Sequence, residues 1–344
     1  MNMDEKLHFA DLSDRLLDWY HEAARDLPWR IGPKARAQGE IADPYRVWLA
    51  EIMLQQTTVP HATRYYLAFT KRWPTVTDLA AAKDEDVMAA WAGLGYYARA
   101  RNLLKCAREV SRLGAWPDTM EGLSKLPGIG PYTAGAVAAL AFGRQVAAVD
   151  GNVDRVFARL MALKGDWKQE KIRLKAQVSA LVPADRPAEF AEALMDLGAT
   201  ICTPKSPNCL ICPLRDMCAG RAEGEPGRYP IKPKKTPKPA RLGHVYIAFD
   251  DAGGVLTERR SESGLLGGML GLPTSDWQDV APNPDFPCSA DWKDVGEIRH
   301  VFTHFSLTLT VWRARVTHLS ELTPRRVAVD ALPSVFKKAL KLAA

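Results

Sequence analysis

Residues 126–155 of the chain, LPGIGPYTAGAVAALAFGRQVAAVDGNVDR, decide its fold. They begin with a tight glycine turn, residues 126–130, between two segments of helical pattern. Gly128 and Gly130 allow a hairpin whose backbone N–H groups point outward, and such a turn can hold a phosphate oxygen. Small residues follow the turn and would let the second helix bring its backbone close to a partner: Thr133, Ala134, Gly135 and Ala136. The pattern predicts two helices joined by a hairpin that can hold an anionic ligand.

A single carboxylate, Asp150, lies near the end of this stretch, at the edge of an apolar run. Apolar residues recur after it at helical spacing, so Asp150 is predicted to lie where a helix begins. Free N–H groups and the helix dipole at that end favour the ionised form of the side chain. Two interpretations stay open at this point, a simple helix cap and a catalytic anion.

A second carboxylate, Glu51, lies within residues 47–54, VWLAEIML, an otherwise apolar helical pattern. A carboxylate among such neighbours loses hydration, so its pKa should rise, as a general acid near neutral pH requires. The pattern alone favours an ordinary exposed glutamate on the polar side of the helix. Together with Asp150, Glu51 would form the pair expected of glycoside chemistry, one proton donor and one standing anion.

Four of the six cysteines crowd into residues 202–218 with the spacing C-x6-C-x2-C-x5-C: Cys202, Cys209, Cys212 and Cys218. Four thiolates from so short a segment can satisfy one tetrahedral zinc or one cubane iron–sulfur cluster. Zinc ribbons usually present two CxxC knuckles, so this irregular loop favours a cluster over zinc and over four unrelated thiols. Cys106 and Cys288 stand alone and are expected to be structural.

The composition sets broad limits on the class of protein. A chain of 344 residues with 47% hydrophobic residues can bury substantial cores and is expected to form two or three domains. No apolar run reaches the length of a membrane span, and the first residues are too polar for a signal peptide, so a cytoplasmic location is expected. The net charge of +6 is compatible with nucleic-acid binding but does not require it.

Helical patterns dominate residues 1–220, which are expected to form an all-α module that includes the cysteine loop. The first helix is amphipathic and a polar loop is expected at residues 31–42. The remaining helices are predicted at 45–56, 61–72, 77–82, 84–91, 98–113, 119–124, 131–141, 152–163, 168–182 and 187–198.

The character of the sequence changes at residue 221. Residues 221–241 are rich in proline and lysine and predict an extended basic linker, which is either a plain spacer or a contact for phosphate. Beyond it the hydrophobic period becomes two, and the alternating runs 244–249 and 305–311 predict strands. With a terminal helix at 333–342, residues 242–344 are expected to form an α+β domain.

These motifs in combination resemble a known family. LPGIGPYTAGAV, VDGNVDR and the four-cysteine spacing are similar to the helix–hairpin–helix DNA glycosylases that carry an iron–sulfur cluster. Residues 43–57, DPYRVWLAEIMLQQT, narrow the resemblance to the adenine DNA glycosylases of the MutY type, and it extends to a C-terminal Nudix-like domain. It implies a base excision repair hydrolase that flips adenine, mispaired with 8-oxoguanine or guanine, out of double-stranded DNA and cleaves its N-glycosidic bond. It also implies one [4Fe-4S] cluster and a monomer associated with the nucleoid.

The resemblance assigns roles to individual residues. Glu51 matches the acid that protonates adenine N7, and Asp150 matches the carboxylate that stabilises or captures the sugar cation. Tyr132 and Asn152 match residues that line the site around that carboxylate. Gln56 matches the side chain wedged into the base stack beside the lesion. Two further positions align with residues of the base pocket: Arg30 and Glu192.

The residue at position 132 bears on the type of reaction. Lyase relatives resembling endonuclease III have at this point of the hairpin a lysine that forms a Schiff base with the sugar, which Tyr132 cannot do. A monofunctional glycosylase that leaves an abasic site is therefore expected. Some enzymes of the MutY type carry a lysine four residues after the catalytic aspartate, where this chain has Asp154, so borohydride trapping should be weak.

In the C-terminal domain, Phe302, Thr303 and His304 match the Phe-Ser-His loop with which the family inspects 8-oxoguanine, and the threonine keeps the hydroxyl. A turn that merely leads into a strand is the alternative. Residues 264–273 match the glycine-rich stretch of Nudix domains, but the acidic box that binds magnesium is missing. No pyrophosphate hydrolysis is expected.

Two other functions stay open. A bifunctional glycosylase and lyase similar to endonuclease III would cut the strand unaided, but Tyr132 and the C-terminal domain argue against it. A DNA-binding scaffold without catalysis would need neither Glu51 nor Asp150.

Overall fold

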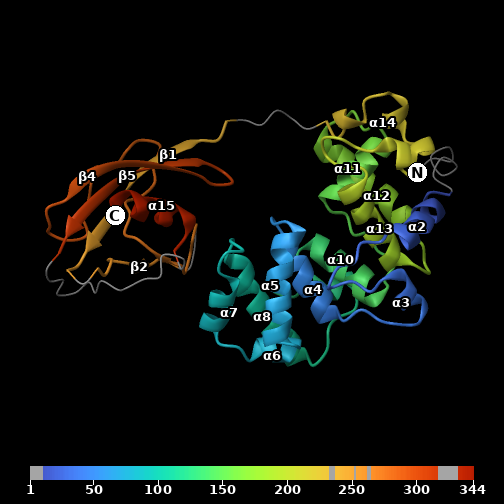
Figure 1. The fold of residues 1–344 in the computed structure, drawn as a ribbon, viewed down its shortest axis with the longest axis horizontal. Coiled ribbons are helices and arrows are strands. Elements are labelled where there is room, and N and C mark those ends of the chain that lie inside the picture. The colour runs from blue at the N-terminus through green and yellow to red at the C-terminus, as the bar shows by residue number, and fades with distance from the viewer. Residues whose placement is uncertain (1–10, 232–236, 252, 262–264, 317–331) are drawn as a thin grey trace. The chain divides into compact units, whose positions relative to one another are not determined.

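The structure is a computed structural model that describes residues 11–231, 237–251, 253–261, 265–316 and 332–344. It divides into two compact units, Met1–Lys234 and Lys235–Ala344. Figure 1 shows that the first unit consists of helices, and the second is built around a small sheet. The predicted combination of an all-α module and an α+β domain is confirmed. No helix in the described parts of the chain is both long and apolar enough to cross a membrane.

The helices of the first unit lie close to the ranges that the sequence predicts. They are α2 (Leu12–Ala23), α3 (Pro33–Ala37), α4 (Pro44–Leu54), α5 (Val59–Arg72), α6 (Val76–Ala80), α7 (Asp84–Trp91), α8 (Ala98–Leu113), α9 (Met120–Leu123), α10 (Pro131–Phe142), α11 (Gly151–Leu160), α12 (Trp167–Leu181), α13 (Pro187–Thr200) and α14 (Ala219–Ala222). Short 3-10 turns at Cys209–Ile211, Arg215–Met217 and Pro226–Arg228 complete the unit.

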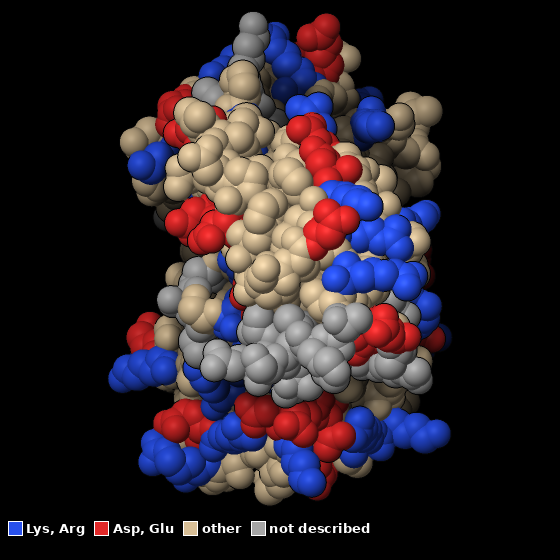
Figure 2. Space-filling model, turned by 90° about the vertical axis from the view of Figure 1, so that its left-hand side faces the viewer, with Lys and Arg blue, Asp and Glu red and all other residues tan. Residues whose placement is uncertain are grey.

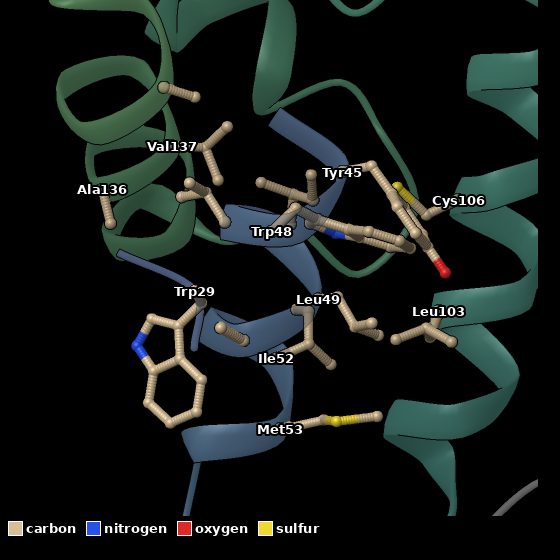
Figure 3. Close-up of a cluster of buried hydrophobic side chains, with 14 of the residues drawn as sticks. Trp29, Tyr45, Trp48, Leu49, Ile52, Met53, Leu103, Cys106, Ala136 and Val137 are labelled. Carbon is tan, nitrogen blue, oxygen red and sulfur yellow. The ribbon is translucent and has the colours of Figure 1, made fainter. Parts of the chain in front are cut away.

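Two hydrophobic cores stabilise the helical unit. The first surrounds α4, which packs between α10 and α8 (Figure 3). The second joins α2, α11 and α12 to the cysteine loop. Helix α13 contributes to both cores, Ala191 and Met195 to the first and Phe190 and Leu197 to the second. Any space enclosed between the cores is therefore walled by α4 and α10 on one side and by α11 on the other.

Helix α4 begins at a cap and ends two residues before its predicted end. The Asp43 side chain accepts a hydrogen bond from the Tyr45 backbone N–H at 2.9 Å, and Pro44 occupies the first helical position, where no N–H is needed. Residues from both sides of the helix are buried, because α8 and α10 cover opposite faces. This explains why its sequence is apolar nearly throughout rather than amphipathic.

Only one glycine of the 126–130 turn needs to be glycine for conformational reasons. Gly128 has a φ of +75°, and a Cβ there would lie 2.6 Å from Cβ of Asn102. Gly130 has an ordinary φ of −86° and open space where a Cβ would be, so the conformation of the turn does not require glycine at this position. Farther along α10, a Cβ on Gly135 would lie 3.1 Å from the carbonyl oxygen of Ala147, which confirms a close backbone approach.

The polar loop predicted at residues 31–42 contains helix α3, so that prediction is wrong in part. Pro33 begins the helix, and the Arg36 N–H bonds to the Gly32 carbonyl at 3.0 Å. Five residues are too few to display a helical period in the sequence.

The first part of the segment predicted as a linker packs on the helical unit. Helix α14 begins before it, and Tyr229 is only 1% exposed within the second core. A single buried tyrosine in a proline- and lysine-rich segment gives no periodic signal, so composition alone does not reveal this packing. Residues 232–236 lie outside the described residues.

The second unit has a three-stranded sheet in the order β1-β5-β4, with β1 at Ala240–Phe249, β5 at Ser306–Arg315 and β4 at Lys293–Val301. Strand β1 runs parallel to β5, and β4 runs antiparallel to it. Helix α15 (Ser334–Ala343) covers one face through Phe336, and a small pair, β2 (Glu258–Arg259) with β3 (Leu270–Gly271), completes the unit. The sequence did not predict β4, because this edge strand is mostly exposed and lacks clear alternation.

Charges of both signs are mixed on the face drawn in Figure 2. Lysine and arginine side chains lie beside aspartate and glutamate side chains at the margins of a broad uncharged area. The net charge of +6 is therefore not gathered into one basic field on that face.

Candidate active site

A cavity of about 580 Å³ lies between the elements of the two helical cores. This volume falls within the range usual for small-ligand pockets. Its lining includes seven of the site residues that the sequence indicated: Arg30, Glu51, Gln56, Tyr132, Asp150, Asn152 and Glu192. They come from segments far apart in the chain, so the fold itself assembles them. Gly128 lines a separate, smaller cavity beside Asn102.

Glu51 is buried, at 7% exposure, so the expectation of an ordinary exposed glutamate is wrong. Burial raises the pKa of Glu51 to about 7, and the negative charges of Asp150 and Glu192 act in the same direction. The hydroxyl of Tyr132 donates a hydrogen bond to Oε2 of Glu51 at 2.9 Å and opposes the rise. Close to neutral pH this carboxyl can therefore hold and release a proton.

Tyr132, at the start of α10, faces Glu51. Burial raises the pKa of the Tyr132 hydroxyl well above its ordinary value, and the charge of Glu51 adds to the rise. The hydroxyl therefore remains a hydrogen-bond donor over the whole accessible pH range. The resemblance placed Tyr132 around the aspartate, whereas its hydrogen bond in the structure goes to the glutamate.

Asp150 is the N-cap of α11 and also lies in the cavity wall, so the two interpretations of this residue are compatible. Its Oδ1 accepts hydrogen bonds from the backbone N–H groups of Asn152 and Val153, both at 2.8 Å. Its Oδ2 accepts one from the Asn152 side-chain amide at 2.8 Å. Three donors thus fix the orientation of the carboxylate at the start of the helix.

Arg155, which sequence reasoning missed, fixes Asn152 in turn. Its guanidinium donates to Oδ1 of Asn152 at 2.8 Å and to the Gly198 carbonyl at 2.7 Å. The same side chain donates to the Cys202 carbonyl at 2.8 Å. Arg155 therefore ties the cavity wall to α13 and to the cysteine loop. An arginine inside a strongly amphipathic helical pattern was the available signal, but such residues are usually solvent-exposed.

A buried group of charges is centred on α13, which contributes Glu192 to the lining of the cavity. Asp196 on α13 pairs with Arg25 and Arg30, each at 2.7 Å. Glu192, one turn earlier on α13, accepts a hydrogen bond from the Tyr20 hydroxyl at 2.8 Å. Asp196 and Arg25 were not predicted from the sequence. Glu192 and Asp196 are spaced i, i+4 within an apolar helix, and this spacing could have indicated that both acids are buried on the same face.

Gln56 follows α4 at the rim of the cavity with an unusual backbone. Its φ of +59° is in the left-handed region, which is uncommon for a residue other than glycine. Arg99 on α8 supports this conformation by donating hydrogen bonds to the carbonyls of Ile52 at 2.9 Å and Gln55 at 2.6 Å. Gln56 is exposed, so its side chain is free to contact a ligand outside the cavity.

The four cysteines predicted as ligands surround a single space next to α11, and none of them forms a disulfide. The described residues contain no group of three or more His, Cys, Asp or Glu side chains arranged to hold a single metal ion. A multinuclear cluster needs its sulfur ligands farther apart than one zinc ion does, so the four thiols fit a cluster better. Cys106 instead lies in the first core (Figure 3), where burial raises its pKa to about 12, as expected of a structural cysteine.

Arg159, on α11, anchors the cysteine loop through hydrogen bonds. Its guanidinium is buried and donates to the carbonyls of Thr203 at 2.8 Å and Pro204 at 2.9 Å and to the sulfur of Cys202 at 3.2 Å. It also reaches the Tyr229 carbonyl at 3.3 Å, which holds the segment after α14. A cationic group beside the four thiols suits an anionic cluster.

In the second unit, Phe302, Thr303 and His304 form the turn between β4 and β5. Phe302 stacks on Trp277 with ring centroids 5.7 Å apart, which fixes the base of the turn. Thr303 and His304 are exposed. These residues thus form a turn that leads into strand β5, which was the alternative interpretation from the sequence. The turn also presents two polar side chains to solvent.

Three family descriptions match successive parts of the chain. Residues 49–181 match the HhH-GPD superfamily of base excision DNA repair proteins. Residues 202–218 match the iron-sulfur binding domain of endonuclease III, and residues 244–342 match the NUDIX domain. The iron–sulfur interpretation of the four cysteines is confirmed at this level.

Solved structures share the helical fold. A thermostable thymine-DNA glycosylase is 28% identical with a TM-score of 0.56, over 63% of this chain and 98% of its own. An endonuclease III in a non-covalent DNA complex is 23% identical with a TM-score of 0.53, over 65% of this chain and 99% of its own, and supports the fold alone.

Curated relatives are more specific. The adenine DNA glycosylase of Homo sapiens is 34% identical over 86% of this chain, which spans 65% of the human protein. That of Rattus norvegicus is 35% identical over 88% of this chain and 71% of its own length. That of Mycobacterium tuberculosis is 40% identical over 71% and 75%. The chain therefore belongs to the adenine DNA glycosylases, the DNA N-glycosylases of the hydrolase class within the helix–hairpin–helix base excision repair superfamily.

Proposed function

We propose that this protein excises adenine mispaired with 8-oxoguanine or guanine in duplex DNA and leaves an abasic site. One observation carries the proposal: a buried glutamate with a pKa of about 7, Glu51, shares a cavity with a fixed carboxylate, Asp150. Cleavage of an N-glycosidic bond needs a proton for the departing base and a negative charge beside the sugar. The two side chains supply one each.

The reaction begins when adenine is flipped out of the duplex into the cavity. Glu51 donates its proton to N7 of the base, while the hydrogen bond from Tyr132 stabilises the carboxylate that remains. Asp150 stabilises the positive charge that develops on the sugar, because its orientation is fixed before the reaction. Water then adds to the sugar and releases one proton, which leaves a hydroxyl group where the base was attached. Arg30 and Glu192, in the wall beside Glu51, contact the base.

The positions of the lysine amines near the cavity support a monofunctional enzyme. Tyr132 offers no amine at the hairpin, and the lysine among the cavity-lining residues, Lys171, forms an ion pair with Asp154 at 2.7 Å. The ammonium form of lysine in such an ion pair has no free lone pair for attack on the sugar. We expect no strand cleavage without alkali and only weak trapping by borohydride.

The cofactor in this proposal is one [4Fe-4S] cluster held by Cys202, Cys209, Cys212 and Cys218. Bound there, it supplies a four-point cross-link of the cysteine loop. Iron and acid-labile sulfide in about equal amounts, with a brown protein, are the expected result. A colourless, zinc-loaded protein from anaerobic purification would contradict it.

Residues 242–344 form the lesion-recognition domain in this proposal, after a basic linker at 221–241. Thr303 and His304 are exposed and polar, as a reader of the oxidised base requires. The hairpin at Gly128 and Gly130 holds the DNA backbone, and Gln56 enters the base stack. The enzyme acts as a monomer on double-stranded DNA, without pyrophosphate hydrolysis.

The test is excision from duplexes that carry adenine opposite 8-oxoguanine, guanine or thymine, with alkali added afterwards to reveal abasic sites. We expect alkali-dependent breaks for the first two duplexes and none for the third. Glu51→Gln and Asp150→Asn should abolish excision and keep binding of the duplex. A matched control is Asp43→Asn, which changes a carboxylate next to α4 outside the cavity. Absence of breaks after alkali would reject the proposal.

A further inference from the structure

Helix α3 is the feature from which the inference starts. None of its residues is fully buried, so it adds little to the cores. Its one inward-reaching charge is Arg36, whose side chain is 17% exposed and lies 3.4 Å from Oε1 of Glu192. Lys34 on the same helix is exposed. Helix α3 therefore delivers one cation to Glu192, which lines the cavity.

The two carboxylates on α13, Glu192 and Asp196, have different arginines as their nearest partners. Arg25 and Arg30 make their short contacts, 2.7 Å each, with Asp196. Arg30 is farther from Glu192, at 3.8 Å. Arg36 is thus the nearest arginine to Glu192 in the described part of the chain.

Arg36 makes few other polar interactions with the described residues. Its Nε is buried and finds no hydrogen-bond partner among the described residues. The ion pair recorded for it in those residues is the one with Glu192. A buried donor left unsatisfied is costly, so the side chain is held in this place for its charge rather than for a full set of hydrogen bonds.

Glu192 depends on the neighbouring cations because it is almost wholly enclosed. Burial raises the pKa of Glu192, while Arg30, Arg36 and the Tyr20 hydroxyl oppose the rise and Asp196 adds to it. Glu51 is coupled to the same carboxylate, since the charge of Glu192 contributes to the raised pKa of Glu51. The charged and titratable groups that bear on Glu192 are Tyr20 from α2, Arg30 from the following loop, Arg36 from α3, Glu51 from α4 and Asp196 from α13.

We propose that Arg36 is a positioning residue: it keeps the carboxylate of Glu192 ionised and turned to the cavity, so that this carboxylate can accept a hydrogen bond from the base that it contacts in the function proposed above. The proposal rests on the adenine excision proposed above. An anionic acceptor selects a base with an amino group, since a keto group in its place would face the carboxylate with a lone pair. Arg36 acts through Glu192 and does not contact the base.

The pH profile of excision gives the first test. Activity requires Glu192 without a proton and Glu51 with one, so the profile has an acid limb from Glu192 and a basic limb from Glu51. Loss of an opposite charge at this distance shifts a pKa by about one unit or more. We expect Arg36→Gln to move the acid limb of the single-turnover rate upward by about one pH unit, which lowers the rate by up to about 10-fold on the acid side of the profile. Arg36→Lys should recover part of the loss.

A double-mutant cycle gives the second test. Because Arg36 acts through Glu192, adding Arg36→Gln to Glu192→Gln should change the excision rate by less than about 2-fold. The control Lys34→Gln, which removes a cation from the same helix, should leave the profile unchanged. Circular dichroism and the Tm of each variant check that the fold is retained.

The outcomes separate this inference from the proposed function. If the unmodified protein excises adenine and Arg36→Gln leaves the acid limb in place, the inference is wrong and the proposed function stands. The inference would also be overturned if Arg36→Gln lowered the excision rate by the same factor in the unmodified protein and in Glu192→Gln. Arg36 would then act by a route that does not involve Glu192. If the unmodified protein releases no adenine, the proposed function itself fails.

Discussion

At the scale of single residues, the site depends on two carboxylates in opposite environments. Glu51 lies in an apolar helix and shares one hydrogen bond with Tyr132, so burial dominates its behaviour. Asp150 caps a helix and accepts three hydrogen bonds. In the proposed reaction the same functional group thus serves once as a proton donor and once as a standing anion, because the fold places it in two different environments.

The buried glutamate should reduce the stability of the folded protein at alkaline pH. Between the ordinary value of 4.5 and the raised pKa of about 7, the folded state holds a proton that the unfolded state has lost. The free energy of unfolding therefore falls as pH rises through this window, by up to about 3 kcal/mol.

Glu51→Gln removes this penalty and keeps an acceptor for Tyr132. It should raise the Tm at pH 8 and leave it nearly unchanged at pH 4.5, as measured by thermal denaturation at both pH values. Equal Tm differences at the two pH values would show that burial does not perturb Glu51.

Tyr132→Phe removes the hydrogen bond that lowers the pKa of Glu51. We expect the basic limb of the excision profile to move to higher pH, with a loss of about 10-fold in the rate, since the carboxylate formed on proton transfer is less well stabilised. Single-turnover rates between pH 5 and 9 measure both effects. A basic limb that stays in place would separate Tyr132 from proton transfer.

At the scale of elements, α11 links the chemistry to the cysteine loop. Asp150 and Asn152 lie at its first turn, and Arg155 and Arg159 hold the loop from the next turns. Ordering of the loop therefore bears on the position of the cavity wall, although none of the cysteines lines the cavity.

Arg159→Met would leave the Thr203 and Pro204 carbonyls without their buried donor. We expect a loss of stability on the order of 3 kcal/mol and faster loss of iron from the loop. Urea denaturation and iron content over time provide the measurements. The control Lys205→Met changes an exposed cation on the same loop and should behave as the unmodified protein. Equal iron retention in both variants would refute the anchoring role.

The hairpin offers a matched pair of glycine substitutions. Gly128→Ala forces a side chain onto a φ of +75° and against Asn102, so we expect a loss of at least about 1 kcal/mol of stability and weaker duplex binding. Gly130→Ala meets open space at an ordinary φ and should leave the stability nearly unchanged. Chemical denaturation and fluorescence anisotropy compare the two. Similar stability losses in both variants would contradict the assignment of strain to Gly128.

At the scale of the whole molecule, two cores joined by α13 bring Glu51 and Asp150 to one cavity. The sequence predicted most helices, the strands at 244–249 and 305–311, the four cysteines and seven residues of the cavity, because their local patterns or motifs are distinctive. It did not predict Asp196, Arg36, Arg99 or Arg155. Their roles depend on partners far away in the chain, and an isolated charged residue is usually exposed.

The same reason explains the errors. Glu51 was expected on the polar side of its helix because a local pattern does not show that α8 and α10 cover opposite faces of α4. Helix α3 was missed because it is only one turn long, and the buried Tyr229 was missed because the segment around it has the composition of a linker.

The central claim, that Glu51 supplies the proton for adenine departure, is tested most directly by the pH dependence of single-turnover excision from a duplex with adenine opposite 8-oxoguanine. For the unmodified protein we predict alkali-labile sites whose rate of formation falls as pH rises through about 7. Glu51→Gln should form none at any pH while binding the duplex. Excision by Glu51→Gln at a rate near that of the unmodified protein would contradict the account.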